Sequence, residues 1–173
     1  MQKGLVHIYT GEGKGKTTAA VGLAVRAKSK GMKVFFAQFM KSAPPAANEL
    51  DVLEGLSVRI FQYSEVLSPF FHPDADKKQL MRKASEALKE IEALMPGYDI
   101  VILDEFNNLV SRGIVSEEEA LRFVKEKPEN VELVLTGRNA TRGLIEAADY
   151  VTEMKAVKHP LQLGIKARPG IEY

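Results

Sequence analysis

The sequence has no cysteine and no tryptophan among its 173 residues. The absence of cysteine excludes disulfides and metal sites built from thiolates. The formal net charge of +1 gives no electrostatic reason to expect binding to nucleic acid or to a membrane surface, so we expect neither as a partner. No apolar run approaches the roughly 20 residues that span a bilayer. The chain enters its first predicted strand without the layout of a signal peptide, so we expect a cytoplasmic protein.

The overall composition is that of an ordinary globular protein. Hydrophobic residues make up 45% and charged residues 27% of the chain, in the usual range for such proteins. The length predicts a single domain over residues 1–173. A chain of this size buries about 70% of its unfolded surface, which is enough for a full core without covalent cross-links.

A glycine-rich stretch near the N-terminus carries the strongest functional signal. An apolar run over residues 5–9 predicts a buried strand, and residues 19–27 predict a helix. A strand, a glycine-rich turn, Gly-Lys-Thr and a helix are the layout of a phosphate-binding loop. Small residues let successive backbone N–H groups turn inward around an anion, and the positive end of the helix adds to their attraction. The predicted phosphate-binding residues are Thr10, Gly11, Glu12, Gly13, Lys14, Gly15, Lys16, Thr17 and Thr18.

Two residues of this loop have roles that follow from the motif. Lys16 is expected to reach the outer phosphates, and the Thr17 hydroxyl is expected to bind Mg²⁺. The usual spacing G-x-x-x-x-G-K-[ST] has glycine at its first position, where this chain has Thr10. A glycine-rich turn without a ligand is the less favoured interpretation. A dinucleotide-binding turn is rejected, because it needs an acidic residue at the end of the second strand and this chain has none there.

That second strand is predicted over residues 33–39. Its connection to the first strand through a helix predicts a βαβ unit with parallel pairing. Residues 40–49, which include two successive prolines, are predicted as a loop at the carboxyl end of the strand, where ligands bind in open α/β sheets. Lys41 and Glu49 are therefore candidates for ligand contact. Solvated loop charges are an equally good interpretation of each.

A second loop contains adjacent aromatic residues. After a short strand predicted at 58–61, residues 62–73 hold Phe70, Phe71 and His72, with a proline on each side that resists regular structure. We favour the interpretation that the aromatic rings attach this loop to the core. The alternative is an apolar wall for a large flat ligand.

A second chemical landmark lies near the middle of the chain. A helix is predicted over residues 74–95, followed by a strand at 98–105 that ends in Asp104 and Glu105. In phosphate-loop proteins an acid at such a strand end binds Mg²⁺, directly or through water. A further helix is predicted to begin after Ser116 as its N-cap, in a capping-box pattern.

The last part of the chain continues the alternation of strands and helices. A strand is predicted over residues 131–136, a short helix over 141–148 and a last strand over 150–154. Arg138 follows the first of these strands, where it is placed to stabilise phosphate charge. The pattern predicts a three-layer α/β fold like that of phosphate-loop NTPases, with a mostly parallel central sheet and helices on both faces.

The sequence resembles the phosphate-loop type of ATP:corrinoid adenosyltransferase. The resemblance includes the loop variant with Thr10 in place of glycine and runs in order to the last residues. The matching stretches are 9–19, 38–41, 103–105, 135–139, 147–149, 151–154, 157–160 and 170–173.

The resemblance implies an unusual reaction. Co(I) of a reduced corrinoid attacks C5′ of ATP, and the whole triphosphate leaves. It implies ATP and a corrinoid as substrates, Mg²⁺ as a cofactor and a homodimer. A reductant protein such as a flavodoxin or a flavin reductase is a possible partner. The family binds ATP reversed along the loop, which places the reacting carbon toward the corrinoid.

The resemblance also implies roles for particular residues. Residues 11–18 would bind the triphosphate, and Lys16 and Arg138 would be catalytic. Thr17 with Asp104 or Glu105 would hold Mg²⁺. Further residues are implied around the substrates: Gln38, Lys41, Glu49 and Arg138 near ATP, and Phe70, Phe71 and His72 near the corrin ring, where some members have a Phe and a Trp.

Two other functions are compatible with a phosphate loop. A generic phosphate-loop ATPase or small-molecule kinase would release ADP. A non-catalytic carrier would bind ATP and corrinoid without turnover. The matches outside the phosphate loop favour the transferase, because a generic ATPase has no need of them.

Overall fold

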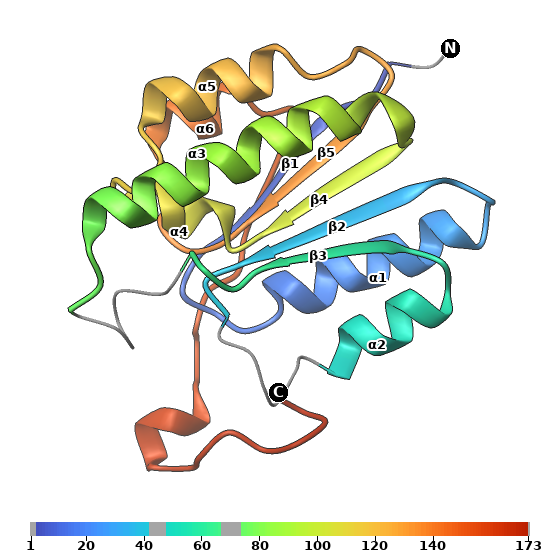
Figure 1. The fold of residues 1–173 in the computed structure, drawn as a ribbon. Coiled ribbons are helices and arrows are strands. Elements are labelled where there is room, and N and C mark those ends of the chain that lie inside the picture. The colour runs from blue at the N-terminus through green and yellow to red at the C-terminus, as the bar shows by residue number, and fades with distance from the viewer. Residues whose placement is uncertain (1–2, 42–47, 67–73, 173) are drawn as a thin grey trace.

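The computed structural model describes residues 3–41, 48–66 and 74–172 (Figure 1). Within these residues, six strands form one sheet in the order β3-β2-β4-β5-β1-β6, and each neighbouring pair is parallel. The strands are β1 (Val6–Thr10), β2 (Val34–Phe39), β3 (Arg59–Tyr63), β4 (Ile100–Asp104), β5 (Glu132–Thr136) and β6 (Tyr150–Glu153). The helices are α1 (Lys16–Lys28), α2 (Asn48–Gly55), α3 (Lys77–Leu94), α4 (Phe106–Ser111), α5 (Glu117–Lys125) and α6 (Arg142–Ala147), with short 3₁₀ turns η1 (Met95–Gly97) and η2 (Pro160–Leu163).

Helices cover both faces of the sheet, so the predicted three-layer α/β architecture is confirmed. α3, α4, α5 and α6 lie on one face, and α1 and α2 on the other (Figure 1). The first face is packed by a large cluster that includes Phe35, Ile91 and Phe123. The second face is packed by a smaller cluster, to which α1 contributes Ala24 and α2 contributes Leu53. All residues of β2 and β4 are buried, as expected for parallel strands covered on both sides.

The position of the first strand corrects one prediction. The connection from β1 through α1 to β2 gives two parallel strands, as predicted, but they are not neighbours. β4 and β5 lie between them, since β2 pairs with β4 and β1 pairs with β5. The hydrophobic pattern predicts β1 and β2 as buried strands, but the choice of neighbour depends on how the later strands pack. The βαβ pattern therefore predicted correctly that the two strands are parallel, but it did not predict the order of strands in the sheet.

Two helices are absent from the sequence-based predictions. α2 begins at Asn48, within the stretch predicted as a loop, so the loop prediction is wrong for residues 48–49. α4 follows β4 directly and begins after Glu105. Both helices are short, with 8 and 6 residues, and so give little periodic signal.

The capping prediction at Ser116 is confirmed. The Ser116 side chain accepts a hydrogen bond from the Glu119 backbone N–H at 3.1 Å. The Glu119 carboxylate accepts instead from the Ser85 hydroxyl of α3, at 2.9 Å. In a capping box the Glu119 carboxylate would accept from the backbone N–H of Ser116. Here it joins α5 to α3 instead. Among the helices the structure describes, none is long and apolar enough to cross a membrane.

The unpredicted helix α2 gives a test of this fold. Leu53 of α2 is fully buried against the sheet, so Leu53→Ala should lower the free energy of unfolding by about 2–5 kcal/mol. The neighbouring Val52 is 63% exposed, and Val52→Ala should change it by less than about 0.5 kcal/mol. Urea unfolding of both variants measures the difference. Equal effects would mean that α2 does not pack as described.

Candidate functional site

A cleft of about 610 Å³ opens at the carboxyl edge of the sheet. The phosphate loop forms one side of it, and Lys41, Glu105 and Arg138 enter from three other segments. The remaining lining comes from α1, α2 and the C-terminal segment. The cleft therefore brings together residues from across the chain, at the edge where ligands bind in open α/β sheets.

The phosphate loop is held by backbone contacts to the segment after β6. The Gly13 N–H donates to the Met154 carbonyl at 2.6 Å, and the Met154 N–H donates to the Thr10 carbonyl at 2.8 Å. At Gly11 the backbone has a φ of 95°, and a Cβ would lie 2.5 Å from the Met154 oxygen. Only glycine fits there. Gly15, with a φ of 119°, makes the turn into α1.

The hydroxyl of Thr10 has a specific contact that explains its departure from the usual loop spacing. Its Oγ1 accepts a hydrogen bond from the Ala140 N–H at 3.1 Å. Thr10 is buried, and the bond ties the phosphate loop to the segment that carries Arg138. Glycine could not make this contact.

Lys16 is directed back along the loop. Its Nζ donates to the carbonyls of Gly11 at 2.6 Å and Gly13 at 2.8 Å, so the ammonium lies within the loop. Burial lowers the pKa of Lys16, and the nearby guanidinium of Arg138 lowers it further. These two cations sit close enough to repel each other, which favours an anion between them.

Asp104 is the centre of a hydrogen-bond network. Its side chain is fully buried. Its Oδ1 accepts from the hydroxyls of Thr17 at 2.9 Å and Thr136 at 2.7 Å. Its Oδ2 accepts from Gln38 Nε2 at 3.1 Å and lies 3.2 Å from the Lys41 ammonium. The carboxylate thus joins β4 to α1, β5 and the end of β2.

Two further contacts extend this network. Gln62 of β3 donates to the Gln38 side-chain oxygen at 3.1 Å, which fixes the orientation of the Gln38 amide. Lys41 lies 3.7 Å from Glu49 of α2 as well as beside Asp104. Gln38 is almost fully buried and does not line the cleft. Its contact with the site is the hydrogen bond that it donates to Asp104.

Glu105 follows Asp104 but faces the cleft. Its backbone is left-handed, with a φ of 66°, and its N–H donates to the Thr136 hydroxyl at 3.0 Å. Its carboxylate accepts a hydrogen bond from the Asn108 side chain. Burial raises the pKa of Glu105, and the adjacent Asp104 carboxylate raises it further. A neighbouring cation would relieve both effects.

Arg138 reaches the cleft from the turn after β5. Its N–H donates to the Asn108 side-chain oxygen at 2.7 Å, and its guanidinium lies 3.3 Å from Glu12. Gly137 has a φ of 130°, and a Cβ there would lie 3.0 Å from the Asn108 nitrogen. The turn is therefore packed closely on α4, the helix that the sequence did not reveal.

The C-terminal segment forms another wall. Lys14 Nζ donates to the Ile171 carbonyl at 2.6 Å and lies 3.3 Å from Glu172. Hydrogen bonds from Arg168 lower the pKa of Glu172 to about 2, so it is an anion at neutral pH. Lys14 is thus bound to the end of the chain, and His159 and Gly170 also line the cleft. Phe70, Phe71 and His72 lie outside the described residues.

Residues 2–173 match the family described as ATP:corrinoid adenosyltransferase BtuR/CobO/CobP. The chain belongs to this family. It is 37% identical to a corrinoid adenosyltransferase of Sinorhizobium sp over 99% of this chain and 81% of that protein. The corrinoid adenosyltransferase of Escherichia coli K12 is 34% identical, and the corrinoid adenosyltransferase CobA of Salmonella typhimurium LT2 is 33% identical, each over 99% of this chain and 87% of the relative.

The fold has a more distant likeness. The crystal structure of a KaiC-like protein, PH0186 from Pyrococcus horikoshii OT3, superposes with a TM-score of 0.56 and 18% identity. The match covers 90% of this chain and 74% of the other. It supports the predicted phosphate-loop NTPase-like architecture of this adenosyltransferase.

The adenosyltransferase site contains residues that sequence reasoning did not single out. Thr136, Gln62 and Asn108 hold Asp104, Gln38 and Glu105, while Ile171 and Glu172 hold Lys14. A polar residue at the end of a buried strand, such as Thr136, is the signal that could have found one of them. The others depend on contacts between distant segments.

One glycine of the loop and one glycine of α1 provide a matched pair of variants. Gly11→Ala should weaken ATP binding and lower stability, because its Cβ would collide with the Met154 backbone. Gly22 lies in α1, and nothing lies within 4 Å of the point that a Cβ would occupy, so Gly22→Ala should raise the free energy of unfolding by about 0.5–1 kcal/mol. Calorimetric ATP titration and urea unfolding measure both. Unchanged ATP affinity in Gly11→Ala would mean that the backbones of Gly11 and Met154 do not approach each other as closely as described.

Proposed function

We propose that the cleft at the carboxyl edge of the sheet transfers the 5′-deoxyadenosyl group of ATP to Co(I) of a corrinoid and releases triphosphate. The observation that carries the proposal is the convergence of the phosphate loop, Lys16, Arg138 and the Asp104 network in one cleft. The family match along the chain identifies the class of reaction. The generic ATPase is disfavoured, because the match includes segments that ATP hydrolysis does not require.

In this proposal the triphosphate lies along the phosphate loop. We assign the anion site to the start of α1 and to the loop N–H groups of residues 11–18, apart from the Gly13 N–H, which donates to Met154. Lys16 and Arg138 approach it from two sides, and their mutual repulsion is relieved when phosphate oxygens lie between them. Lys14 is bound to Ile171, so we assign it to holding the C-terminal wall.

The chemical step is a displacement at C5′. The Co–C5′ bond forms with an electron pair from Co(I), which becomes Co(III). The C5′–O bond breaks, and its electron pair leaves with the triphosphate. Because no proton is transferred, no general base is needed. The loop, Lys16 and Arg138 stabilise charge on the leaving group, and the protein's main task is to position the two substrates and to exclude water.

Mg²⁺ is the cofactor that the donor set fits. The Thr17 hydroxyl and the carboxylates of Asp104 and Glu105 are hard oxygen donors. Both oxygens of Asp104 are already engaged, so we assign it to orienting Thr17, and Glu105 to the metal. Within the described part of the chain, no cluster of three or more His, Cys, Asp or Glu could hold an ion alone. Mg²⁺ bound partly by phosphate oxygens needs fewer protein ligands and would supply further charge stabilisation.

Further expectations complete the proposal, and all of them except the cytoplasmic location are implied by the resemblance. The protein is proposed to be a cytoplasmic homodimer, to take electrons from a flavodoxin or flavin reductase, and to bind the corrin ring near Phe70, Phe71 and His72. Gln38, Lys41 and Glu49 are proposed to act around ATP, with Gln38 acting through Asp104.

An anaerobic reaction tests the function directly. The protein is mixed with Mg·ATP and chemically reduced cobalamin, the visible spectrum is followed, and the phosphate product is identified. We expect the spectrum of an alkylcobalamin and an equimolar amount of triphosphate. ADP with an unchanged corrinoid would establish an ATPase, and binding of both ligands without turnover would establish a carrier.

Lys16→Ala should reduce turnover about tenfold or more, because it removes a charge-assisted contact worth roughly 1.5–3 kcal/mol. Lys125→Ala, which removes an exposed lysine of α5 far from the loop, serves as the control and should retain the wild-type rate. The same anaerobic assay measures both. A wild-type rate in Lys16→Ala would remove the loop lysine from the mechanism.

Glu105→Gln should reduce the extent to which Mg²⁺ stabilises the complex of the protein with ATP. The melting temperature with ATP is measured with and without Mg²⁺, which follows binding separately from activity. We expect the extra stabilisation by Mg²⁺ to fall in Glu105→Gln and in Asp104→Asn, and to persist in Glu118→Gln, an exposed acid of α5. If neither site variant changes it, the metal is held elsewhere.

A further inference from the structure

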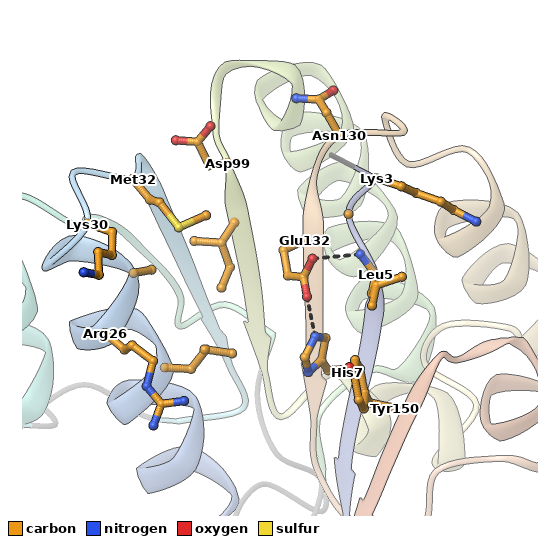
Figure 2. Close-up of a pocket in the computed structure, with 14 residues that line it drawn as sticks. Lys3, Leu5, His7, Arg26, Lys30, Met32, Asp99, Asn130, Glu132 and Tyr150 are labelled. Carbon is orange, nitrogen blue, oxygen red and sulfur yellow. Dashed lines mark hydrogen bonds and ion pairs between the residues drawn. The ribbon is translucent and has the colours of Figure 1, made fainter. Parts of the chain in front are cut away.

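We propose that a second pocket, at the amino edge of the sheet, binds an organic anion that carries a flat ring. The pocket has a volume of about 720 Å³, within the range of small-molecule sites. Figure 2 shows α1 with Arg26 and Lys30 on one side, and Glu132, His7 and Tyr150 from β5, β1 and β6 on the other.

This pocket lies at the opposite end of the sheet from the proposed catalytic cleft. Its lining includes Ile100, Glu132 and Tyr150, the first residues of three parallel strands, whereas the phosphate loop follows the carboxyl end of β1. The pocket exists because α1 and α2 do not cover all the strands on this face of the sheet equally. The buried residues of the second core cluster come from α1, α2, β2, β4, β5 and the residue Val58 before β3. On this face β1 contributes only partly buried side chains, and the residues of β6 are exposed.

The charges of the pocket favour an anion. Its acids are already engaged: Glu132 accepts from the Leu5 N–H at 2.8 Å and from His7 at 2.5 Å, and Asp99 accepts from the Lys33 N–H at 2.7 Å. Its cations are not. Among the described residues, the side chains of Arg26 and Lys30 make no hydrogen bond or ion pair. The charged groups of the pocket that have no partner in the described part of the chain are therefore cations, and Arg26 offers the planar donor geometry that suits a carboxylate, sulfonate or phosphate.

The rest of the pocket favours an apolar ring. The His7 and Tyr150 rings lie 4.6 Å apart at an interplanar angle of 33°, and the bond to Glu132 fixes the His7 ring. Tyr150 is 53% exposed, so this aromatic surface is open to a ligand. The apolar residues that line the pocket are Leu5, Leu23, Ala27, Met32 and Ile100. A flat ring against this surface, with its anionic group toward Arg26 and Lys30, uses both halves of the pocket.

The test uses anilinonaphthalene sulfonate, a fluorescent aromatic anion, as the probe. Its binding site is mapped by backbone amide NMR shifts of the full-length protein in the presence of saturating Mg·ATP, which occupies the other cleft. We expect shifts in the segments that line the amino-edge pocket, residues 3–7, 23–32, 99–100, 130–132 and 150. Shifts confined to residues 11–18, or no shifts, would overturn the proposal.

Charge-matched variants test the assignment of the anion site. Arg26→Gln with Lys30→Gln should weaken probe binding about tenfold or more, since charge-assisted contacts are lost. Lys78→Gln with Lys89→Gln removes the same charge from α3 on the opposite face and should leave the affinity within about twofold. Equal losses in the two pairs would mean that only net charge attracts the probe, which would refute a built site.

A third variant tests the aromatic wall. Tyr150→Thr keeps a strand-forming residue but removes the ring, and should weaken probe binding several-fold while the melting temperature stays near that of the wild type. Sedimentation of both proteins is measured alongside. A change of oligomeric state in Tyr150→Thr, with no probe binding to the wild type, would show that a second copy covers this face and would overturn the proposal.

Discussion

The buried carboxylate of Asp104 is the interaction on which the site depends. It accepts hydrogen bonds from α1, β5 and β2 and lies beside the Lys41 ammonium. A buried carboxylate is unfavourable unless it is paired and hydrogen-bonded, and here each oxygen has two partners. Because the partners come from separate elements, satisfying this one group fixes how the phosphate-loop helix sits on the sheet.

A second set of contacts joins the phosphate loop to later parts of the chain. Thr10 accepts from Ala140, Gly13 donates to Met154, and Lys14 donates to Ile171. The loop is therefore held from three segments that lie far from it in the sequence. Catalysis of this reaction depends on how the triphosphate and the corrinoid are positioned. Holding the phosphate loop in place is therefore the main contribution of the protein. The adenosyltransferase supplies little chemistry of its own, because the nucleophile and the leaving group both belong to the substrates.

The two ends of the sheet have different chemistry for one geometric reason. Parallel strands place all their carboxyl ends together and all their amino ends together. The carboxyl edge collects the loops with Lys16, Glu105 and Arg138. The amino edge collects Glu132, His7 and Tyr150 against the end of α1. α1 starts in the phosphate loop and reaches the amino-edge pocket with its last turn, so one helix borders both.

The sequence alone determined the contiguous features: the phosphate loop, the two acids at the end of β4, the longer helices and the family. These depend on neighbouring residues or on short periods, which are visible without a fold. Only the tertiary structure decided the strand order, the helices α2 and α4, the support of Asp104 by Thr136, and the pocket around His7. Each of these depends on which distant segments pack together, and the local sequence pattern does not specify those contacts.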